Sequence, residues 1–279
     1  MLDLIVFYVG LFLSSVAAAW DLKTTEIPDE IPYAIAIIGI FAHFLYSLNV
    51  HTFMPLVYSL VFGFVFLVIG FAMYYTGQWG GGDAKLLTAI GVSTYMIPTK
   101  DALPFPLDFF VNLFLVGSVY IIFYSLVLSI RNKKIWKEFI RKVKEEKKEL
   151  IAYSFGVFIL VFLSSFIFYS AYGLKFNLDV LLFSFTMSVV AFCLIVLLKF
   201  GRVVEDVGFK KRIRVSQLKV GDVLAESKVW EGLSQEEIMR IKKSKRKYVW
   251  IKEGVRFAPA FPLALVATHW VGNLLLLIF

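Results

Sequence analysis

The sequence consists mainly of long apolar runs that are separated by short polar segments. A helix that crosses a bilayer needs about 20 mostly apolar residues, and eight stretches approach this length. They cover residues 2–19, 32–49, 55–75, 84–98, 107–130, 150–172, 178–200 and 257–279, of which 84–98 is the shortest. The pattern therefore predicts an all-α polytopic membrane protein with about eight transmembrane helices.

The polar stretch 131–149 carries a helical pattern of its own. Ile135, Phe139 and Val143 recur four residues apart, which places them on one face of a helix. Many lysines surround this face. A basic amphipathic helix can lie on anionic lipid headgroups, and it can equally serve as a solvated connector. The sequence leaves both interpretations open.

The polar stretch 201–256 predicts a small cytoplasmic α+β domain. Ser234 followed by Glu237 is typical of a capping box at the start of a helix. Strands are expected where Ile213 and Val215 alternate with polar residues and at 248–251, and a turn is expected at 220–222, before Val223 and Leu224. The basic run 242–247 could bind RNA or lipid, but it is more typical of a solvated helix end, so we predict no nucleic-acid partner.

Composition narrows the class of protein further. Hydrophobic residues make up 59% of the chain and charged residues 18%, whereas soluble domains average about 45–50% and about 25%. The single cysteine, Cys193, excludes a disulfide or a cysteine-rich zinc site within the chain. These values exclude a soluble globular domain, a disordered chain and a disulfide-stapled module.

The net charge of +8 gives the expected orientation. If the eight runs alternate across the bilayer, 27 of the 29 basic residues lie on one side. Basic loops are retained in the cytoplasm. We therefore expect both termini to face outward and the stretches 131–149 and 201–256 to be cytoplasmic.

Two acidic residues stand apart from the others. Most acids lie in loops, and Asp3, Asp108 and Asp179 lie at outer span ends, where a charge can reach water. Asp21, in contrast, ends the first span, and Asp83 opens the fourth. If the eight spans alternate across the bilayer, these two carboxylates lie at the same depth on the same face of the membrane. Ionisable residues within spans usually serve a function.

A glycine run, Gly80-Gly81-Gly82, directly precedes Asp83. Residues without a Cβ atom allow sharp bends and close approach of another chain. Irregular backbone at membrane depth is tolerated where it is buried or lines a watery cavity, so the run favours a wet cleft with Asp83 on its wall. The alternative is a tight interhelical turn in which Asp83 only caps a helix.

Two facing carboxyl groups define a specific chemistry. They cannot both ionise easily, so the pair shares one proton. One carboxylate then activates water, while its protonated partner polarises a peptide carbonyl and later protonates the leaving amine. This chemistry requires neither a metal nor a cofactor. The three histidines, His43, His51 and His269, do not form a recognisable metal site.

At these residues the chain resembles the GxGD-type membrane aspartyl proteases, and among them the archaeal type IV prepilin and preflagellin peptidases. The segment 80–87 is similar to the second catalytic motif of that family, and Asp21 followed by Ile27-Pro28-Asp29 is similar to the first. The segments 220–224 and 254–262 resemble the cytoplasmic part and last span of the archaeal enzymes.

The resemblance implies an activity and a set of residues. Such enzymes remove short basic leader peptides from pilin-like or archaellin precursors at the cytoplasmic membrane face. Asp21 and Asp83 would be catalytic, and Gly80, Gly81, Gly82 and Lys85 would support the cleft. Glu26, Asp29 and Glu30 would attract a basic leader, or they are ordinary solvated loop residues. Bacterial relatives with a cysteine-rich loop also methylate their product; this chain lacks such a loop, so we expect no methyltransferase activity.

The expected organisation follows from these assignments. Residues 1–130 form a catalytic membrane core, 131–149 a basic interfacial helix, 150–200 two further spans, 201–256 the cytoplasmic domain and 257–279 the last span. The sequence gives no role for 131–200. Two other functions use the same residues differently: a proton- or cation-coupled transporter, in which the aspartates bind the ion, and a membrane anchor for the cytoplasmic domain.

Overall fold

The computed structural model describes residues 2–100, 103–173, 178–227, 232–244 and 246–277. It is mostly helical, with one small sheet. The chain forms two compact units, one of residues 1–123 together with 210–279 and the other of residues 124–209. Each unit is described by itself below.

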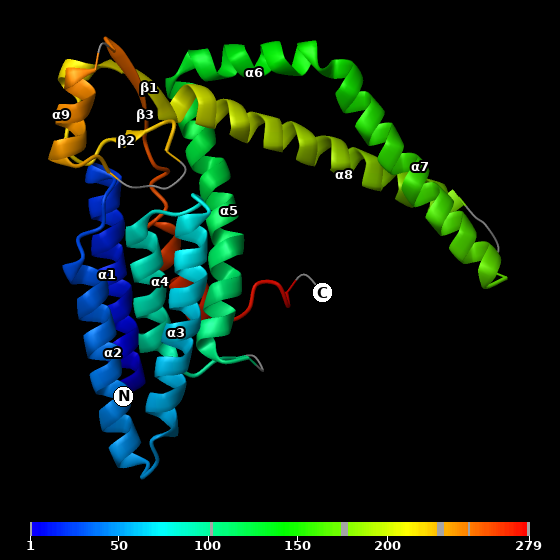
Figure 1. Ribbon diagram of the computed structural model, residues 1–279. Coiled ribbons are helices and arrows are strands. Elements are labelled where there is room, and N and C mark those ends of the chain that lie inside the picture. Colours follow the sequence, from blue (N-terminus) through cyan, green and yellow to red (C-terminus); the bar gives the residue numbers. More distant parts are fainter. Residues whose placement is uncertain (1, 101–102, 174–177, 228–231, 245, 278–279) are drawn as a thin grey trace. The chain divides into compact units, whose positions relative to one another are not determined.

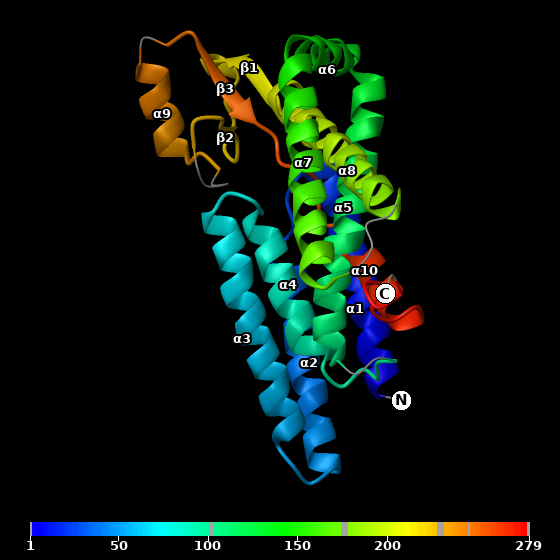
Figure 2. The same ribbon diagram turned by 90° about the vertical axis from the view of Figure 1, so that its right-hand side faces the viewer.

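The first unit contains a bundle of helices, most of them long (Figure 1). Its helices are α1 (Leu2–Thr24), α2 (Glu30–Asn49), α3 (Met54–Tyr75), α4 (Gly81–Thr94), α5 (Phe105–Arg131), which continues into the second unit, and α10 (Ala260–Trp270). The helix α4 contacts α1, α2 and α3, and α10 packs beside α1 (Figure 2). The shortest of the N-terminal helices is thus the centre of the bundle.

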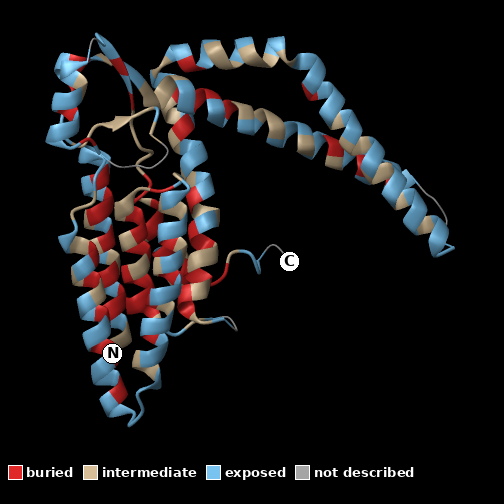
Figure 3. Ribbon diagram, in the orientation of Figure 1, coloured by how far each residue is buried: buried red, intermediate tan, exposed pale blue. Residues whose placement is uncertain are grey.

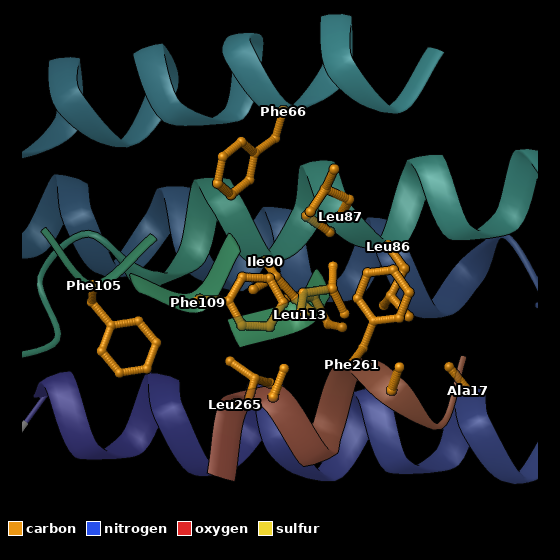
Figure 4. Close-up of a cluster of buried hydrophobic side chains, with 14 of the residues drawn as sticks. Ala17, Phe66, Leu86, Leu87, Ile90, Phe105, Phe109, Leu113, Phe261 and Leu265 are labelled. Carbon is orange, nitrogen blue, oxygen red and sulfur yellow. The ribbon is translucent and has the colours of Figure 1, made fainter. Parts of the chain in front are cut away.

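The position of α4 follows from its side chains. Most of its side chains are apolar or small, and nearly all of its residues after Gly82 are buried, which is typical of a helix enclosed by protein (Figure 3). Leu86, Leu87 and Ile90 lie between Phe66 of α3 and Phe261 of α10 (Figure 4).

Small residues bring the neighbouring helices close to α4. A Cβ atom added at Gly63 of α3 would lie 2.2 Å from Cγ2 of Val92, and one added at Gly70 would lie 3.0 Å from Cα of Ala84. Glycine therefore lets α3 approach the Val92 side chain and the Ala84 backbone closely, as small residues do in many membrane helix pairs. The contact at Ala84 is next to Asp83, at the start of α4.

The cytoplasmic domain expected from the sequence is a three-stranded antiparallel sheet with one helix. The strands β1 (Lys210–Arg214), β2 (Val223–Leu224) and β3 (Tyr248–Lys252) have the order β1-β3-β2, with Arg214 opposite Tyr248 and Leu224 opposite Ile251. The helix α9 (Gln235–Lys243) follows the sheet's second strand.

Most local predictions for this domain are confirmed. The hydroxyl of Ser234 accepts from the Glu237 N–H at 3.3 Å, and the Glu237 carboxylate accepts from the Ser234 N–H at 2.8 Å, which is the predicted capping box. The strand at 248–251 is present. The expectation that Val215 continues the first strand is wrong, because β1 ends at Arg214 and a 3₁₀ turn follows, in which the Gln217 side chain accepts from the Arg214 N–H.

The second unit contains α6 (Lys133–Glu145), α7 (Lys147–Ala171) and α8 (Leu178–Val203), followed by a π-helical turn over Val204–Phe209. The predicted face of α6 is used inside this unit: Ile135 is fully buried and, with Phe139, packs against Phe200 of α8. That face is therefore occupied by protein. Ser154 and Ser188 join α7 to α8, each hydroxyl donating to the other's carbonyl.

Six helices are long and apolar enough to cross a membrane by length and composition: α1, α2, α3, α5, α7, and α8 with its following turn. This identifies a multi-pass membrane protein. The predicted spans 84–98 and 257–279 correspond to α4, about 21 Å long, and α10, about 17 Å long. Both are shorter than a bilayer core of about 30 Å, so the count of eight and the orientation stay predictions. Residues 278–279 of the last span lie outside the described residues.

One sequence expectation at the far end of the bundle is wrong. Asp108 does not reach water but is fully buried. Its carboxylate accepts from the hydroxyl of Thr99 at 3.0 Å and from the side-chain amide of Asn273 at 2.8 Å. The Asn112 amide donates to the Thr268 hydroxyl at 3.0 Å. These bonds tie α10 and the residues after it to the start of α5.

Candidate active site

Asp21 lies on the buried face of α1. This face repeats at helical spacing through Ser14, Ala17 and Ala18, whose small side chains allow close packing. The side chain of Asp21 is 6% exposed. Its Oδ2 atom accepts a hydrogen bond from the backbone N–H of Ala258, at 3.1 Å. A residue 237 positions away in the sequence thus anchors this carboxylate.

The loop after Asp21 has an unusual backbone. Thr25 has a φ angle of +63°, in the left-handed region that β-branched residues rarely adopt. Its N–H donates to the carbonyl of Asp21 at 2.8 Å and thereby ends α1. Such strained residues cluster at functional sites. The turn directs the following residues, through Ile27, towards the glycine run.

Asp83 lies in the first turn of α4 and is 9% exposed. Its Oδ2 atom accepts from the N–H of Gly80 at 3.3 Å. The helix-capping role and a place in a cavity, which the sequence presented as alternatives, therefore coexist at this residue.

The three glycines before Asp83 have different roles. None has a φ angle in the left-handed region, so the expected sharp bend is not made by these residues; Gly77, at φ +73°, makes the preceding turn. A Cβ atom at Gly82 would lie 2.9 Å from Cβ of Ile27, whereas one at Gly81 would meet nothing closer than 3.7 Å. Gly82 is thus the point of close approach between the two motifs.

Asp21 and Asp83 line one cavity of about 550 Å³. The two carboxyl groups lie close enough for the charge of Asp21 to interact with Asp83. Three parts of the chain supply the walls: the loop after α1, the residues before α4, and the sheet domain with the segment that leads into α10. The principal lining residues are 21, 23–27, 78–83, 121, 221–223, 232 and 251–257. Its size is in the range of sites that hold a ligand or a few peptide residues.

The two carboxyl groups are held in the same way. In each, Oδ2 accepts one backbone N–H, from Ala258 for Asp21 and from Gly80 for Asp83. Within the described ranges, the Oδ1 atoms make no hydrogen bond. One oxygen of each group is therefore fixed in place while the other can bind a water molecule or a peptide.

The remaining predicted residues divide into two groups. Glu26 lines the cavity. Lys85 does not contact Asp83 but donates to Asp29 at 2.6 Å, in a partly exposed ion pair. Asp29, Glu30 and Lys85 are not among the lining residues. The structure thus brings Glu26 to the aspartates and leaves the other three outside the cavity.

Sequence reasoning missed the contribution of the segment between β3 and α10. Arg256 lines the cavity and lies close enough for its charge to act on Asp21, and Ala258 anchors that aspartate. The only signal was the resemblance of 254–262 to the archaeal enzymes, which assigned these residues no role.

No group of three or more His, Cys, Asp or Glu residues in the described part of the chain could hold a metal ion. His43 is instead structural: its Nδ1 lies 2.7 Å from the Gly39 carbonyl, and its Nε2 accepts from the Met96 N–H at 3.2 Å. The expectation of no cofactor stays a prediction.

The fold and the site together define a multi-pass helical membrane protein in which two buried carboxyl groups meet at one cavity. Residues 6–129 match the type IV leader peptidase family. This segment contains Asp21, Asp83 and the glycine run between the helices α3 and α4. The resemblance expected from the two motifs is confirmed there.

Proteins of three archaea are similar to parts of this chain. A preflagellin peptidase of Methanococcus voltae is 30% identical over 152 residues, which cover 49% of this chain and 64% of that protein. A preflagellin peptidase of Methanococcus maripaludis is 28% identical over 165 residues, covering 54% and 70%, and one of Methanocaldococcus jannaschii is 32% identical over 100 residues, covering 35% and 41%. The chain thus spans slightly less than two thirds of the Methanococcus voltae protein.

Proposed function

We propose that this protein is a membrane-embedded aspartyl endopeptidase that removes the short basic leader from type IV prepilin-like or archaellin precursors. The observation that carries the proposal is that Asp21 and Asp83 line one cavity, each with one anchored and one available oxygen. The match of residues 6–129 to leader peptidases, and the relatives named preflagellin peptidase, support this substrate class.

The chemistry uses one proton shared by the two carboxyl groups. The ionised carboxylate takes a proton from water as the water oxygen attacks the scissile carbonyl carbon. The protonated partner donates a hydrogen bond to the carbonyl oxygen. When the C–N bond breaks, the leaving amine receives a proton, and the pair returns to its singly protonated state. No metal, cofactor or methyl donor takes part.

Acidic residues outnumber basic ones in the cavity, which fits a basic leader. Five acidic residues line it, with Glu26 among them, against three basic residues. We propose that Glu26 contacts the leader directly. Asp29 is engaged by Lys85, and Glu30 opens α2, so these two acids would act on the leader only from outside the cavity.

We infer the location of the site from the expected charge distribution. The site lies at the end of the bundle that adjoins the sheet domain, and the basic stretches are expected on the cytoplasmic side. We therefore place the active site at the cytoplasmic face of the cell membrane, where a precursor's leader precedes its apolar helix. The partners are the precursor proteins and the lipid bilayer, without nucleic acid.

The test is co-expression with a candidate prepilin or archaellin precursor, with cleavage followed by gel shift. Asp21→Asn and Asp83→Asn are each expected to abolish cleavage while the protein still inserts. Asp179→Asn, which changes an acid at the start of α8, is the matched control and should cleave normally. Cleavage that survives either active-site change would overturn the proposal. Cation uptake into proteoliposomes that is lost in Asp83→Asn, without any cleavage, would support the transporter alternative.

A further inference from the structure

We infer that Arg256 binds a backbone carbonyl oxygen of the extended substrate beside Asp21 and is a specificity-determining residue of the site. The inference rests on the proposed function. It assigns a role to the segment between β3 and α10, for which the sequence offered only a resemblance.

The first observation is a buried donor without an acceptor. The Nε atom of Arg256 is inaccessible to solvent and has no hydrogen-bond partner among the residues that the structure describes. Leaving such a donor unsatisfied is unfavourable, and most buried polar groups are paired. Arg256 is one of the residues that line the cavity. Rotation of its side chain would turn Nε towards an acceptor supplied by a bound molecule.

The second observation is that Arg256 is held in a fixed relation to Asp21. Its own carbonyl accepts from the hydroxyl of Tyr120 at 2.8 Å. Two residues later, the N–H of Ala258 donates to Asp21 at 3.1 Å. The arginine and the catalytic carboxylate are thus attached to the same short stretch of backbone, so an acceptor bound by Arg256 lies near the reacting group.

The other cations of the cavity do not offer the same site. Lys252 donates to the carbonyl of Ser227 at 2.8 Å, and Lys23 is exposed at the end of α1. Neither has a buried donor left without a partner in the described chain. Arg256 therefore combines position, burial and free hydrogen-bonding capacity.

The charge of the lining indicates which acceptor fits. Five acidic side chains line the cavity, at positions 21, 26, 83, 222 and 253. They would repel a negatively charged group of the substrate but not a neutral peptide carbonyl. The planar guanidinium can hold such an oxygen in a defined direction. Arg256 would thus select an extended peptide backbone in a single register.

The test compares Arg256→Gln and Arg256→Lys with wild type in the cleavage of a synthetic leader peptide. A hydrogen bond from a charged donor corresponds to about 10- to 100-fold in affinity. We expect Arg256→Gln to raise KM by that factor with little change in kcat, because uniform binding is lost. Arg256→Lys should recover only part of this loss, since lysine lacks the Nε–H. Arg214→Gln, which changes an arginine outside the cavity, should match wild type.

A double-mutant cycle separates loss of a direct contact from structural damage. Peptide binding is measured in Asp83→Asn protein, with and without Arg256→Gln, for a series of peptides in which one carbonyl near the cut is replaced by methylene. The peptide that lacks the carbonyl bound by Arg256 should bind equally well to both proteins. If every peptide weakens by the same factor, or if Arg256→Gln has the wild-type KM, the inference is overturned. Failure of wild type to cleave any leader peptide would instead overturn the proposed function.

Discussion

At the scale of single residues, the site depends on which hydrogen bonds and close contacts each side chain makes. Lys85 is an example: it forms an ion pair with Asp29, and exposed pairs of this kind contribute about 0–1 kcal/mol to stability. Its contact joins the loop after α1 to the first turn of α4. Lys85 therefore helps to position the two motifs without facing either aspartate.

The glycine run provides a matched pair of substitutions. Gly82→Ala places a Cβ atom 2.9 Å from Ile27, so the two motifs must separate, and we expect a loss of stability of about 1–3 kcal/mol and reduced cleavage. Gly81→Ala, with its nearest neighbour at 3.7 Å, should leave the stability unchanged. Thermal melting in detergent and leader cleavage would measure both. Equal behaviour of the two variants would contradict the assigned close contact.

At the scale of elements, α10 is positioned from both of its ends. Its first turn follows Ala258, which binds Asp21, and its last turns are tied to α5 through Asp108 and Asn112. The short helix packs beside α1 (Figure 2). The polar cluster at one end therefore supports the geometry of the site at the other.

This arrangement predicts different effects for two changes at Asp108. Asp108→Ala removes a buried acceptor of the Asn273 amide and the Thr99 hydroxyl, which should cost about 1–3 kcal/mol. In Asp108→Asn, the new amide oxygen can accept from Asn273, and its NH₂ group can donate to Thr99, whose hydroxyl then accepts instead of donating. Wild type and Asp108→Asn should therefore melt at similar temperatures, both higher than the melting temperature of Asp108→Ala. A larger loss for asparagine than for alanine would show that the negative charge itself is required.

The helix α6 illustrates how packing decides between two uses of an amphipathic face. The spacing of Ile135 and Phe139 predicted that this face is apolar, but the sequence did not say what covers it. In the second unit it packs against Phe200 of α8. On α6, the exposed apolar residues are Trp136 and Ile140, which lie off the predicted face.

At the scale of the whole molecule, the candidate site is confined to one compact unit. All of its lining residues belong to 1–123 and 210–279, and the second unit contributes none. The family match, residues 6–129, likewise ends before α6 begins. The predicted domain boundaries and the role of 131–200 stay predictions.

The orientation across the membrane can be tested with single cysteines in a Cys193→Ser background. The basic stretches are expected in the cytoplasm, so cysteines at Lys137 in α6 and Met239 in α9 should react with a membrane-impermeant maleimide only after permeabilisation. A cysteine at Thr52, between α2 and α3, should react in intact cells. All three positions are exposed. Labelling of Met239→Cys in intact cells would reverse the assigned orientation.

The sequence by itself determined the class of the protein and drew attention to two aspartates that line one cavity in the structure. Apolar runs, the capping box at Ser234 and the motif ending at Asp83 are local patterns, which can be recognised without knowing any tertiary contact. The strand at 248–251 and most helix positions followed for the same reason.

Only the tertiary structure decided what surrounds the aspartates. The anchoring of Asp21 by Ala258, the approach of Ile27 to Gly82 and the place of Arg256 join residues far apart in the chain, and no periodicity encodes such pairs. The burial of Asp108 was missed for the same reason, because its partner Asn273 is 165 residues away. Packing of α1, α4 and α10 in three dimensions turns separate motifs into one cavity.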